Sequence, residues 1–447
     1  MQNSNATAST FTFKGHQWSP QEGKATFTYI IHHNSEEFTF HEVLTFPVTG
    51  ASKDIPQELL QNTLDNVLLA LGMSYYKLFC PKEIVLQDIK LSREQADFWN
   101  TVYTKGLGEF FYQNKLDFHN LISFPVSDFG SSPVSFPRQD RCLVGIGGGK
   151  DSIVAGELLK AMHKDVTAFV VNTHPIKEQT IELLVVGSLV IKREIDPMLL
   201  ELNKREDSYN GHVPFSTFMA FISLFTSLLY HYRYAIFANE ESASYGNVTY
   251  LGEEINHQWS KSLEFEILFQ EYVKRFITSD ITYFSLLRPF SEIAISKRFT
   301  QYPQYFPVFS SCNKNFRIEE KTDKRWCGEC PKCAFIFLML AAFLPKEQVM
   351  GIFGQNLFTK ESLLQTYKEL LGVAAIKPFD CVGTPQEVTV AFSLAMQTHA
   401  YDNDMIMLFF KNEVLPKVED SEALQKEVFA LSEKHRIPKE FQEVLTQ

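Results

Sequence analysis

The feature that most limits what this chain can fold into is a short apolar segment that runs directly into three glycines. Residues 142–146 predict a buried strand, Gly147, Gly148 and Gly149 follow it, and residues 153–161 have a helical pattern. A glycine turn between a strand and a helix lets backbone N–H groups approach a phosphate, because no Cβ blocks the way and the helix N-terminus is partially positive. We therefore expect a phosphate-binding loop here.

Three side chains after the glycines suit a nucleotide site. Lys150 can add a cation, Asp151 can hold Mg²⁺, and Ser152 can donate to a phosphate oxygen while it caps the helix. The loop has neither the Gly-Lys-Ser/Thr of nucleoside triphosphatases nor the dinucleotide fingerprint. A tight turn that uses glycine for steric reasons alone is the structural alternative. The strand before the loop and the Lys-Asp-Ser after it favour the nucleotide site.

The length of 447 residues predicts two to four domains. Residues 1–135 open with the alternation of a β-meander and continue as helices, which predicts a β-rich α+β domain. Strands alternate with helices over residues 136–344, which predicts an α/β domain with a parallel sheet covered on both faces. Residues 345–447 have helical patterns and no evident catalytic cluster.

Charge and hydropathy exclude two classes of partner. The net charge is −11, from 53 acidic and 42 basic residues, and no basic run offers a track for nucleic acid. The longest apolar run, residues 333–344, is shorter than the roughly 18–20 residues that cross a bilayer. Residues 1–14 are polar and lack the pattern of a signal peptide. We expect a soluble cytoplasmic protein that binds neither nucleic acid nor a membrane.

A polar cluster follows another predicted strand, residues 234–238. Open α/β sheets bind ligands at the carboxyl ends of their strands, so side chains delivered there should face the nucleotide. The cluster suggests magnesium binding, proton transfer or a carboxylate clamp. Helix caps and surface carboxylates are the structural alternative. The candidates are Asn239, Glu240, Glu241, His257 and Lys261.

Three further polar residues stand at the ends of predicted elements. His212 precedes the apolar helix that starts near Phe215. It is a candidate base or phosphate donor, or a residue that anchors the turn. Arg288, in Arg-Pro-Phe-Ser-Glu, is either directed at a phosphate or part of a surface ion pair. Asn172 directly follows the predicted strand 166–171 and is a candidate contact to the nucleotide.

Cysteines form a third group of candidate functional residues. Cys327, Cys330 and Cys333 make two C-x2-C steps, and Cys312 lies 15 positions before the first of them. Four thiolates suit structural zinc, whereas three with an open position suit an iron–sulfur cluster. The other three of the seven cysteines have no such spacing and are expected in the hydrophobic core: Cys80, Cys142 and Cys381.

The glycine loop resembles the Ser-Gly-Gly-x-Asp-Ser loop of the ATP pyrophosphatases, the PP-loop superfamily, with Gly147 in place of the first serine. That resemblance implies an adenine nucleotide alpha hydrolase-like fold, cleavage of ATP between its α and β phosphates, and adenylation of a substrate oxygen. Gly147 removes one hydroxyl contact to pyrophosphate. The deazaguanine-nitrile synthases of this superfamily have a comparable zinc-binding cysteine cluster.

The order of motifs resembles one family within that superfamily. Gly-Gly-Gly-Lys-Asp-Ser, Asn-Gly-His-Val-Pro, Asn-Glu-Glu-Ser-Ala, Asn-His-Gln-Trp-Ser-Lys-Ser, Arg-Pro-Phe-Ser-Glu and Cys-Gly-Glu-Cys-Pro-Lys-Cys follow one another over residues 142–340. This order is similar to the UDP-N-acetylmuramoyl-L-alanyl-L-glutamate epimerases of bacterial peptidoglycan synthesis. The resemblance implies an isomerase that inverts the terminal L-Glu of the UDP-linked muramoyl dipeptide through a carboxyl adenylate. ATP and Mg²⁺ are then required, AMP and pyrophosphate are released, and the enzyme is coupled functionally to a muramoyl-L-alanine glutamate ligase.

On this reading the residues divide by role. Gly147 to Ser152 hold pyrophosphate and Mg²⁺, Asn239 to Glu241 line the acyl-adenylate site, and the sequence leaves open whether His257 or His212 carries the proton. Two alternatives remain: another ATP pyrophosphatase, whose adenylate is captured by ammonia or sulfur, and a nucleotide-binding protein without catalysis.

Overall fold

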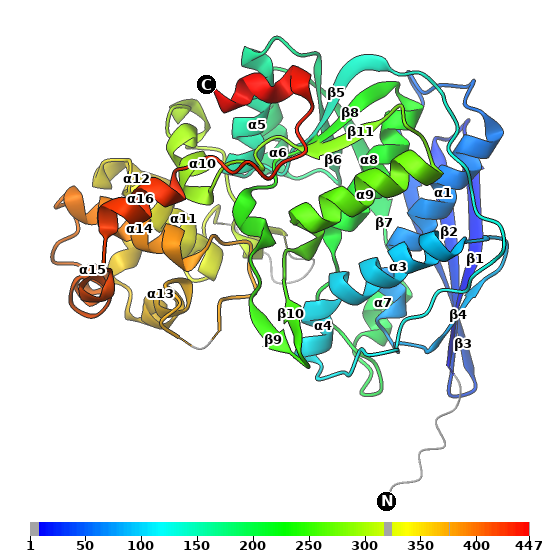
Figure 1. Cartoon of the computed structure of the whole chain (residues 1–447), viewed down its shortest axis with the longest axis horizontal. Coiled ribbons are helices and arrows are strands. Elements are labelled where there is room, and N and C mark those ends of the chain that lie inside the picture. The colour runs from blue at the N-terminus through cyan, green and yellow to red at the C-terminus, as the bar shows by residue number, and fades with distance from the viewer. Residues whose placement is uncertain (1–8, 317–323, 375, 447) are drawn as a thin grey trace, which may run out of the picture.

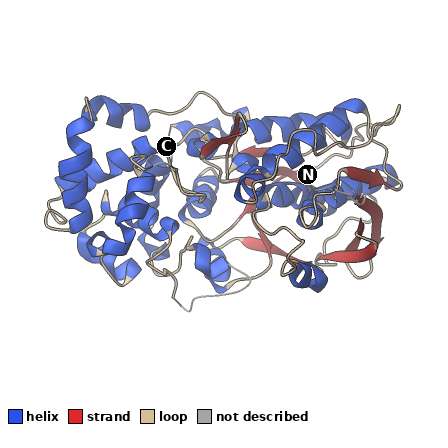
Figure 2. Ribbon diagram, turned by 90° about the horizontal axis from the view of Figure 1, so that it is seen from below, coloured by secondary structure: helices blue, strands red, loops and turns tan. Residues whose placement is uncertain are grey.

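One long sheet organises the structure, a computed structural model that describes residues 9–316, 324–374 and 376–446. Its nine strands follow the order β11-β8-β5-β6-β7-β3-β2-β1-β4. In Figure 1 the N-terminal strands form one end of the molecule and the helical C-terminal region forms the other. In Figure 2, seen from below, one end of the molecule is built of helices, while strands and helices occur together in the rest. None of the described helices is both long and apolar enough to span a membrane.

The parallel half of the sheet confirms the predicted alternation of strands and helices. Its five strands pair in parallel, and both faces are covered, so every residue of β6 is buried. The α/β class is therefore confirmed, while the adenine nucleotide alpha hydrolase-like fold stays a prediction. The elements are β5 (Gln139–Gly145), α5 (Lys150–Ala161), β6 (Val166–Val171), α6 (Pro175–Leu184), β7 (Gly187–Glu194), α7 (Pro197–Leu202), α8 (Phe215–Leu229), β8 (Tyr232–Phe237), α9 (Leu263–Phe276), β11 (Thr282–Ser285) and α10 (Glu292–Phe299).

The N-terminal strands form the predicted antiparallel meander. Val43 pairs with Glu194 of β7, so the meander continues the parallel sheet along its edge. A separate domain over residues 1–135 stays a prediction. A capping box formed by Ser92 and Gln95 starts helix α3. The elements are β1 (Thr10–Ser19), β2 (Lys24–His33), β3 (Glu36–Thr45), α1 (Gln57–Leu71), α2 (Met73–Tyr76), β4 (Glu83–Leu86), α3 (Arg93–Gly106) and α4 (Gly108–Gln113).

The hydrophobic core has two parts, one on each face of the parallel strands. Phe169 and Val171 of β6 point into one part, whereas Ala168 and Val170 point into the other, as the period of two in a strand requires. Helix α8 covers the first face, and α5, α10 and the C-terminal helices cover the second. The remaining elements are β9 (Val248–Tyr250), β10 (Glu253–Ile255), α11 (Pro331–Ala341), α12 (Lys346–Phe353), α13 (Leu364–Leu370), α14 (Pro385–Gln397), α15 (Met405–Phe409) and α16 (Ser421–Val428).

Candidate active site

The candidate residues meet because two neighbouring parallel strands end side by side. Val144 of β5 pairs with Ile236 of β8, and β8 pairs in turn with β11. The chain leaves β5 into the glycine loop, β8 into Asn239, and β11 toward Arg288. Carboxyl ends of parallel strands form the ligand-binding edge of an α/β sheet, so the three predicted groups share that edge.

The glycine loop provides a cradle at this edge. Gly148 has a φ of +85°, and a Cβ there would lie 2.6 Å from the side chain of Ile176, so glycine is required. Ser152 donates its hydroxyl to the carbonyl oxygen of Gly149 at 3.0 Å, and α5 begins without the side-chain cap predicted for Ser152. Ser311 packs against Gly149, and its buried hydroxyl has no hydrogen-bond partner in the described part of the chain. Glycine backbone and an unpaired hydroxyl fit the phosphates of a nucleotide.

Lys150 lies in a buried ion cluster beneath the loop. Its ammonium contacts the carboxylates of Asp151 and Glu292, and Lys332 lies 3.8 Å from the second of these. Burial opposes the charge of Asp151, but the cations Lys150 and Lys332 outweigh it and lower its pKa, whereas burial raises the pKa of Glu292. The Asp151 side chain is 25% exposed and that of Glu292 only 1%, so Asp151 is the carboxylate of this pair that a metal ion can reach.

Arg288 is buried and links two segments of the site by hydrogen bonds. It does not form the surface ion pair that was the alternative to a phosphate contact. Its guanidinium donates to a carboxylate oxygen of Glu266 at 2.9 Å. It also donates to the backbone carbonyl oxygens of Glu240 at 2.6 Å and Lys261 at 2.5 Å. These bonds fix the two predicted site segments relative to each other. The predicted contact of Arg288 with a phosphate stays a prediction.

The residues that follow β8 differ in their surroundings. Asn239 is buried and donates its amide to the hydroxyl of Ser285 at 2.9 Å. Glu240 is also buried, and this burial raises the pKa of its carboxyl. Glu241 is exposed. Two of the three predicted residues therefore lie inside the site region, and their predicted contact with an adenylate is untested.

The two candidate histidines converge on a carboxylate from another element. Nδ1 of His257 lies 2.5 Å, and Nδ1 of His212 3.4 Å, from the same oxygen of Glu109 in α4. Burial opposes the charge of His257, but hydrogen bonds to Cys381 and Glu109 raise its pKa to about 10. Burial and the nearby cations lower the pKa of His212 to about 3. At neutral pH, one histidine is protonated and the other neutral.

Cys381 completes this cluster from the C-terminal region. Its Sγ lies 3.1 Å from Nζ of Lys261, and it hydrogen bonds to His257. The prediction that Cys381 belongs to the hydrophobic core was wrong: the residue is only partly buried and its neighbours are ionic. The same prediction is confirmed for Cys80 and Cys142, which lie in the two parts of the core.

Asn172 lies at the predicted strand end, with its amide engaged by the protein. The side-chain oxygen accepts from the backbone N–H of Arg193 at 2.7 Å, and the side-chain nitrogen donates to the carbonyl oxygen of the same residue at 3.1 Å. These bonds join the ends of β6 and β7. A nucleotide contact by Asn172 stays a prediction.

The four cysteines of the predicted metal cluster converge on one point. Their sulfur atoms all lie within 4.8 Å of one another, with Cys327 and Cys333 3.6 Å apart and Cys312 and Cys330 4.0 Å apart. A tetrahedral zinc with Zn–S bonds of about 2.3 Å requires sulfur atoms about 3.8 Å apart. The residues present therefore fit a four-thiolate zinc site.

Sequence reasoning missed several members of the site region, including Ser311 beside the glycine loop. Glu292 and Lys332 stand inside motifs that were recognised, Arg-Pro-Phe-Ser-Glu and Cys-Pro-Lys-Cys, so their position was a usable signal. Glu109 and Cys381 stand in no motif and lie 148 and 120 positions from His257 and Lys261, their partners in the structure. Only the fold brings them together.

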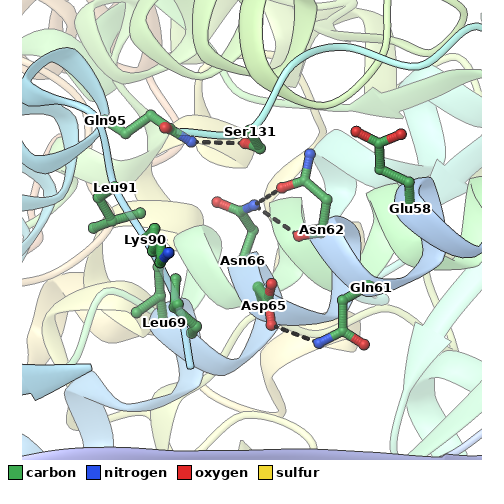
Figure 3. Close-up of a pocket in the computed structure, with 11 residues that line it drawn as sticks. Glu58, Gln61, Asn62, Asp65, Asn66, Leu69, Lys90, Leu91, Gln95 and Ser131 are labelled. Carbon is green, nitrogen blue, oxygen red and sulfur yellow. Dashed lines mark hydrogen bonds between the residues drawn. The ribbon is translucent and has the colours of Figure 1, made fainter. Parts of the chain in front are cut away.

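Two pockets lie near the N-terminal helices. One, of about 540 Å³, includes Gly108 and Asn256, the chain neighbours of Glu109 and His257, but neither Glu109 nor the two candidate histidines line it. The other, of about 200 Å³, lies on α1 and is lined mainly by polar side chains, and Figure 3 shows that many of these are paired with one another. Asn66 donates to Asn62, and Gln95 donates to Ser131 at 2.8 Å. None of the predicted site residues lines either pocket.

Comparison with known proteins gives a consistent result over most of the chain. The model of the MurL N-terminal domain matches residues 2–286, and that of the MurL C-terminal domain matches residues 308–425. Three relatives are each named UDP-N-acetyl-alpha-D-muramoyl-L-alanyl-L-glutamate epimerase. The protein from Xanthomonas oryzae is 36% identical over 96% of this chain and 95% of its own length. The Micromonospora protein is 36% identical over 98% of each chain, and the Salinispora tropica protein is 38% identical over 86% and 84%.

Proposed function

The chain belongs to the MurL family, and from this premise we propose that it inverts the terminal L-glutamate of UDP-N-acetylmuramoyl-L-alanyl-L-glutamate to D-glutamate. The observation that carries the proposal is the adjacency of β5 and β8. It brings a phosphate-sized glycine cradle and a buried cluster of acids and bases to one edge of the sheet. Activation of a carboxylate and transfer of a proton then occur in one place.

Inversion at the α-carbon of glutamate requires that its carboxylate be activated first. Removal of the α-proton beside a free carboxylate places two negative charges together, so the C–H group is a very weak acid. ATP, the second substrate, supplies an adenylyl group that makes the carboxyl neutral and electron-withdrawing. A base of ordinary strength then removes the proton, and buried cations stabilise the charge that develops. Hydrolysis of the adenylate releases the product, with AMP and pyrophosphate formed over the cycle.

We assign the nucleotide to the glycine loop. Gly147, Gly148 and Gly149 offer backbone N–H groups to its phosphates, and the free hydroxyl of Ser311 faces the same loop. Asp151, the accessible carboxylate, holds Mg²⁺, which would neutralise phosphate charge when bound. Lys150, buried against two carboxylates, acts on the phosphates through its charge and keeps Asp151 ionised.

The cysteine cluster is proposed as a structural zinc site. All four positions are thiolates, which leaves no open coordination position for chemistry. Cys312 follows the loop that carries Ser310 and Ser311, and Cys330 and Cys333 flank Lys332. The metal therefore holds in place two segments that reach the glycine loop and the ion cluster.

The test is incubation with the UDP-linked muramoyl dipeptide, ATP and Mg²⁺, followed by chiral analysis of glutamate and assays of AMP and pyrophosphate. We expect D-glutamate, with pyrophosphate release that depends on the dipeptide. Asp151→Asn should reduce both by about 10²-fold or more, in keeping with the loss of a metal ligand at a phosphoryl site. An amidated or thiolated product, or ATP binding without pyrophosphate release, would refute the proposal. Full activity of Asp151→Asn would refute the proposed binding of Mg²⁺ by Asp151.

A further inference from the structure

A cysteine that the proposed function leaves without a role lies in the middle of the acid–base cluster. Cys381 belongs to the segment between α13 and α14, in the region where the sequence shows no catalytic pattern. Its Sγ lies 3.1 Å from the ammonium of Lys261, which belongs to the segment between β10 and α9. It also hydrogen bonds to His257, which is bound in turn to Glu109 of α4. The segment between β10 and α9 thus supplies both partners of this sulfur atom, and α4 holds one of them in place.

We propose that the Cys381 thiolate is the base that removes the α-proton of the activated glutamyl residue. This inference rests on the proposed function, because it names a group that performs its central step. Lys261 and His257 are positioning residues that keep the sulfur ionised, and Glu109 orients His257.

The step is a balanced proton transfer. The Cα–H bond breaks, its electron pair moves toward the activated carbonyl, and an S–H bond forms on Cys381. A second acid delivers a proton to the opposite face and leaves the D-configured centre. Glu240 is suited to be this second acid, because burial favours its protonated form. It also interacts electrostatically with Lys261, as Cys381 does. After product release, the thiol loses its proton to solvent, which restores the thiolate, and solvent reprotonates the second acid.

The surroundings of Cys381 favour the thiolate that this step requires. Burial alone would raise the pKa of the thiol, but the Lys261 ammonium and the hydrogen bond from His257 outweigh it and lower the pKa to about 6. By contrast, burial raises the pKa of the Cys80 thiol to about 12. At neutral pH, Cys381 is therefore ionised and Cys80 is neutral.

Two further observations suggest that a ligand completes this region. Gln258, next to His257, is 3% exposed, and neither end of its side-chain amide has a hydrogen-bond partner among the described residues. A buried amide without partners costs free energy that a bound polar substrate would recover. The pocket of about 540 Å³ opens next to the same segment, at Asn256 and Trp259. None of the cluster residues lines this pocket, which offers room for part of a large substrate beside the segment that carries His257.

The decisive experiment separates the activation of glutamate from the transfer of its proton. In D₂O, wild-type enzyme with the UDP-linked muramoyl dipeptide, ATP and Mg²⁺ is assayed for ATP–pyrophosphate exchange and for deuterium at the α-carbon. The same assays are applied to Cys381→Ser and Cys381→Ala. Cys80→Ser is the matched control, because Cys80 is buried and its thiol, in the described part of the chain, donates to the carbonyl oxygen of Lys77 at 3.7 Å and to no cluster residue.

We expect Cys381→Ser to retain ATP–pyrophosphate exchange within a few fold and to lose α-deuteration and D-glutamate formation by about 10²–10⁴-fold, the usual contribution of a positioned base. Cys80→Ser should retain all three. α-Deuteration within threefold of wild type in either Cys381 variant would overturn this inference and leave the proposed function standing. Equal losses of ATP–pyrophosphate exchange and α-deuteration in both variants would do the same. If wild-type enzyme shows no dipeptide-dependent exchange, the proposed function itself fails, and this inference fails with it.

A second measurement needs no variant. Iodoacetamide at pH 7 should alkylate Cys381 at least tenfold faster than Cys80, as peptide mapping by mass spectrometry reports, and the muramoyl dipeptide should slow the reaction at Cys381. Equal rates at the two cysteines would contradict an ionised thiol.

Discussion

The backbone N–H of Ser310 donates a hydrogen bond of 3.1 Å to the carbonyl oxygen of Gly148. The hydroxyl of Ser310 in turn accepts from the backbone N–H of Cys312 at 3.1 Å and donates to the carbonyl oxygen of Arg325 at 2.7 Å. One serine thus joins the glycine loop to the segment that carries the first cysteine of the cluster. Because of this connection, loss of the proposed zinc should disturb the proposed nucleotide site as well as the fold around the cysteines.

The first prediction follows from this link. Cys330→Ser should lower both the zinc content and the melting temperature, and should weaken ATP binding about tenfold or more, as removal of supporting contacts around a site commonly does. Elemental analysis, thermal denaturation and ATP titration measure the three effects. The wild-type chain should hold about one zinc, and less than about half a zinc in protein never exposed to chelators would contradict the four-thiolate site. Cys80→Ser serves as the control for loss of a cysteine elsewhere.

The glycine loop gives a second prediction. Gly148→Ala should destabilise the protein by about 1–3 kcal/mol, because a residue with a Cβ is strained at a φ of +85° and the new methyl would meet Ile176 at 2.6 Å. Gly147→Ala is the matched control for stability, since nothing lies within 4 Å of a Cβ at that position. Denaturation in urea compares the two. Equal stability of both variants would refute the required left-handed conformation at Gly148.

The buried brace at Arg288 gives a third prediction. Arg288→Met should cost about 3–5 kcal/mol of stability, because it leaves the buried carboxylate of Glu266 without its partner. Arg275→Met is the control: its ion pair with Glu94 has side chains more than half exposed and should contribute about 1 kcal/mol or less. Equal losses in urea denaturation would argue against a brace role for Arg288.

The sequence predicted the parts of this structure that depend on local pattern. Strand β6 is placed exactly, because six consecutive apolar or β-branched residues buried on both faces have one reading in an α/β chain. The cysteine cluster was also predicted, because the two C-x2-C steps from Cys327 to Cys333 are typical of metal sites, while the fold brings Cys312 to them.

The contacts that the sequence did not predict join residues far apart in the chain or depend on charged neighbours. The pairing of Val43 with Glu194 joins the meander to the parallel sheet across 151 positions, and no local pattern encodes it. Cys381 was assigned to the core because an isolated cysteine is usually a small apolar side chain, whereas its partners Lys261 and His257 are brought to it only by the fold. The roles of site residues depend on such neighbours.

The last prediction concerns pH. Lys261, His257, Lys332 and Lys377 are the charged groups that act on Cys381, and the first three lower its pKa to about 6 against the effect of burial. A base is active in its deprotonated form, so the rate of α-deuteration should rise as pH increases through about 6 and level off above 7. His257→Gln removes one of the stabilising partners, so the pKa of Cys381 should rise and the whole increase should move to higher pH. ATP–pyrophosphate exchange, measured over the same range, is the control, since activation of the carboxylate does not use the thiolate. A deuteration profile that has the same midpoint in wild type and His257→Gln would show that Cys381 is not ionised by this contact.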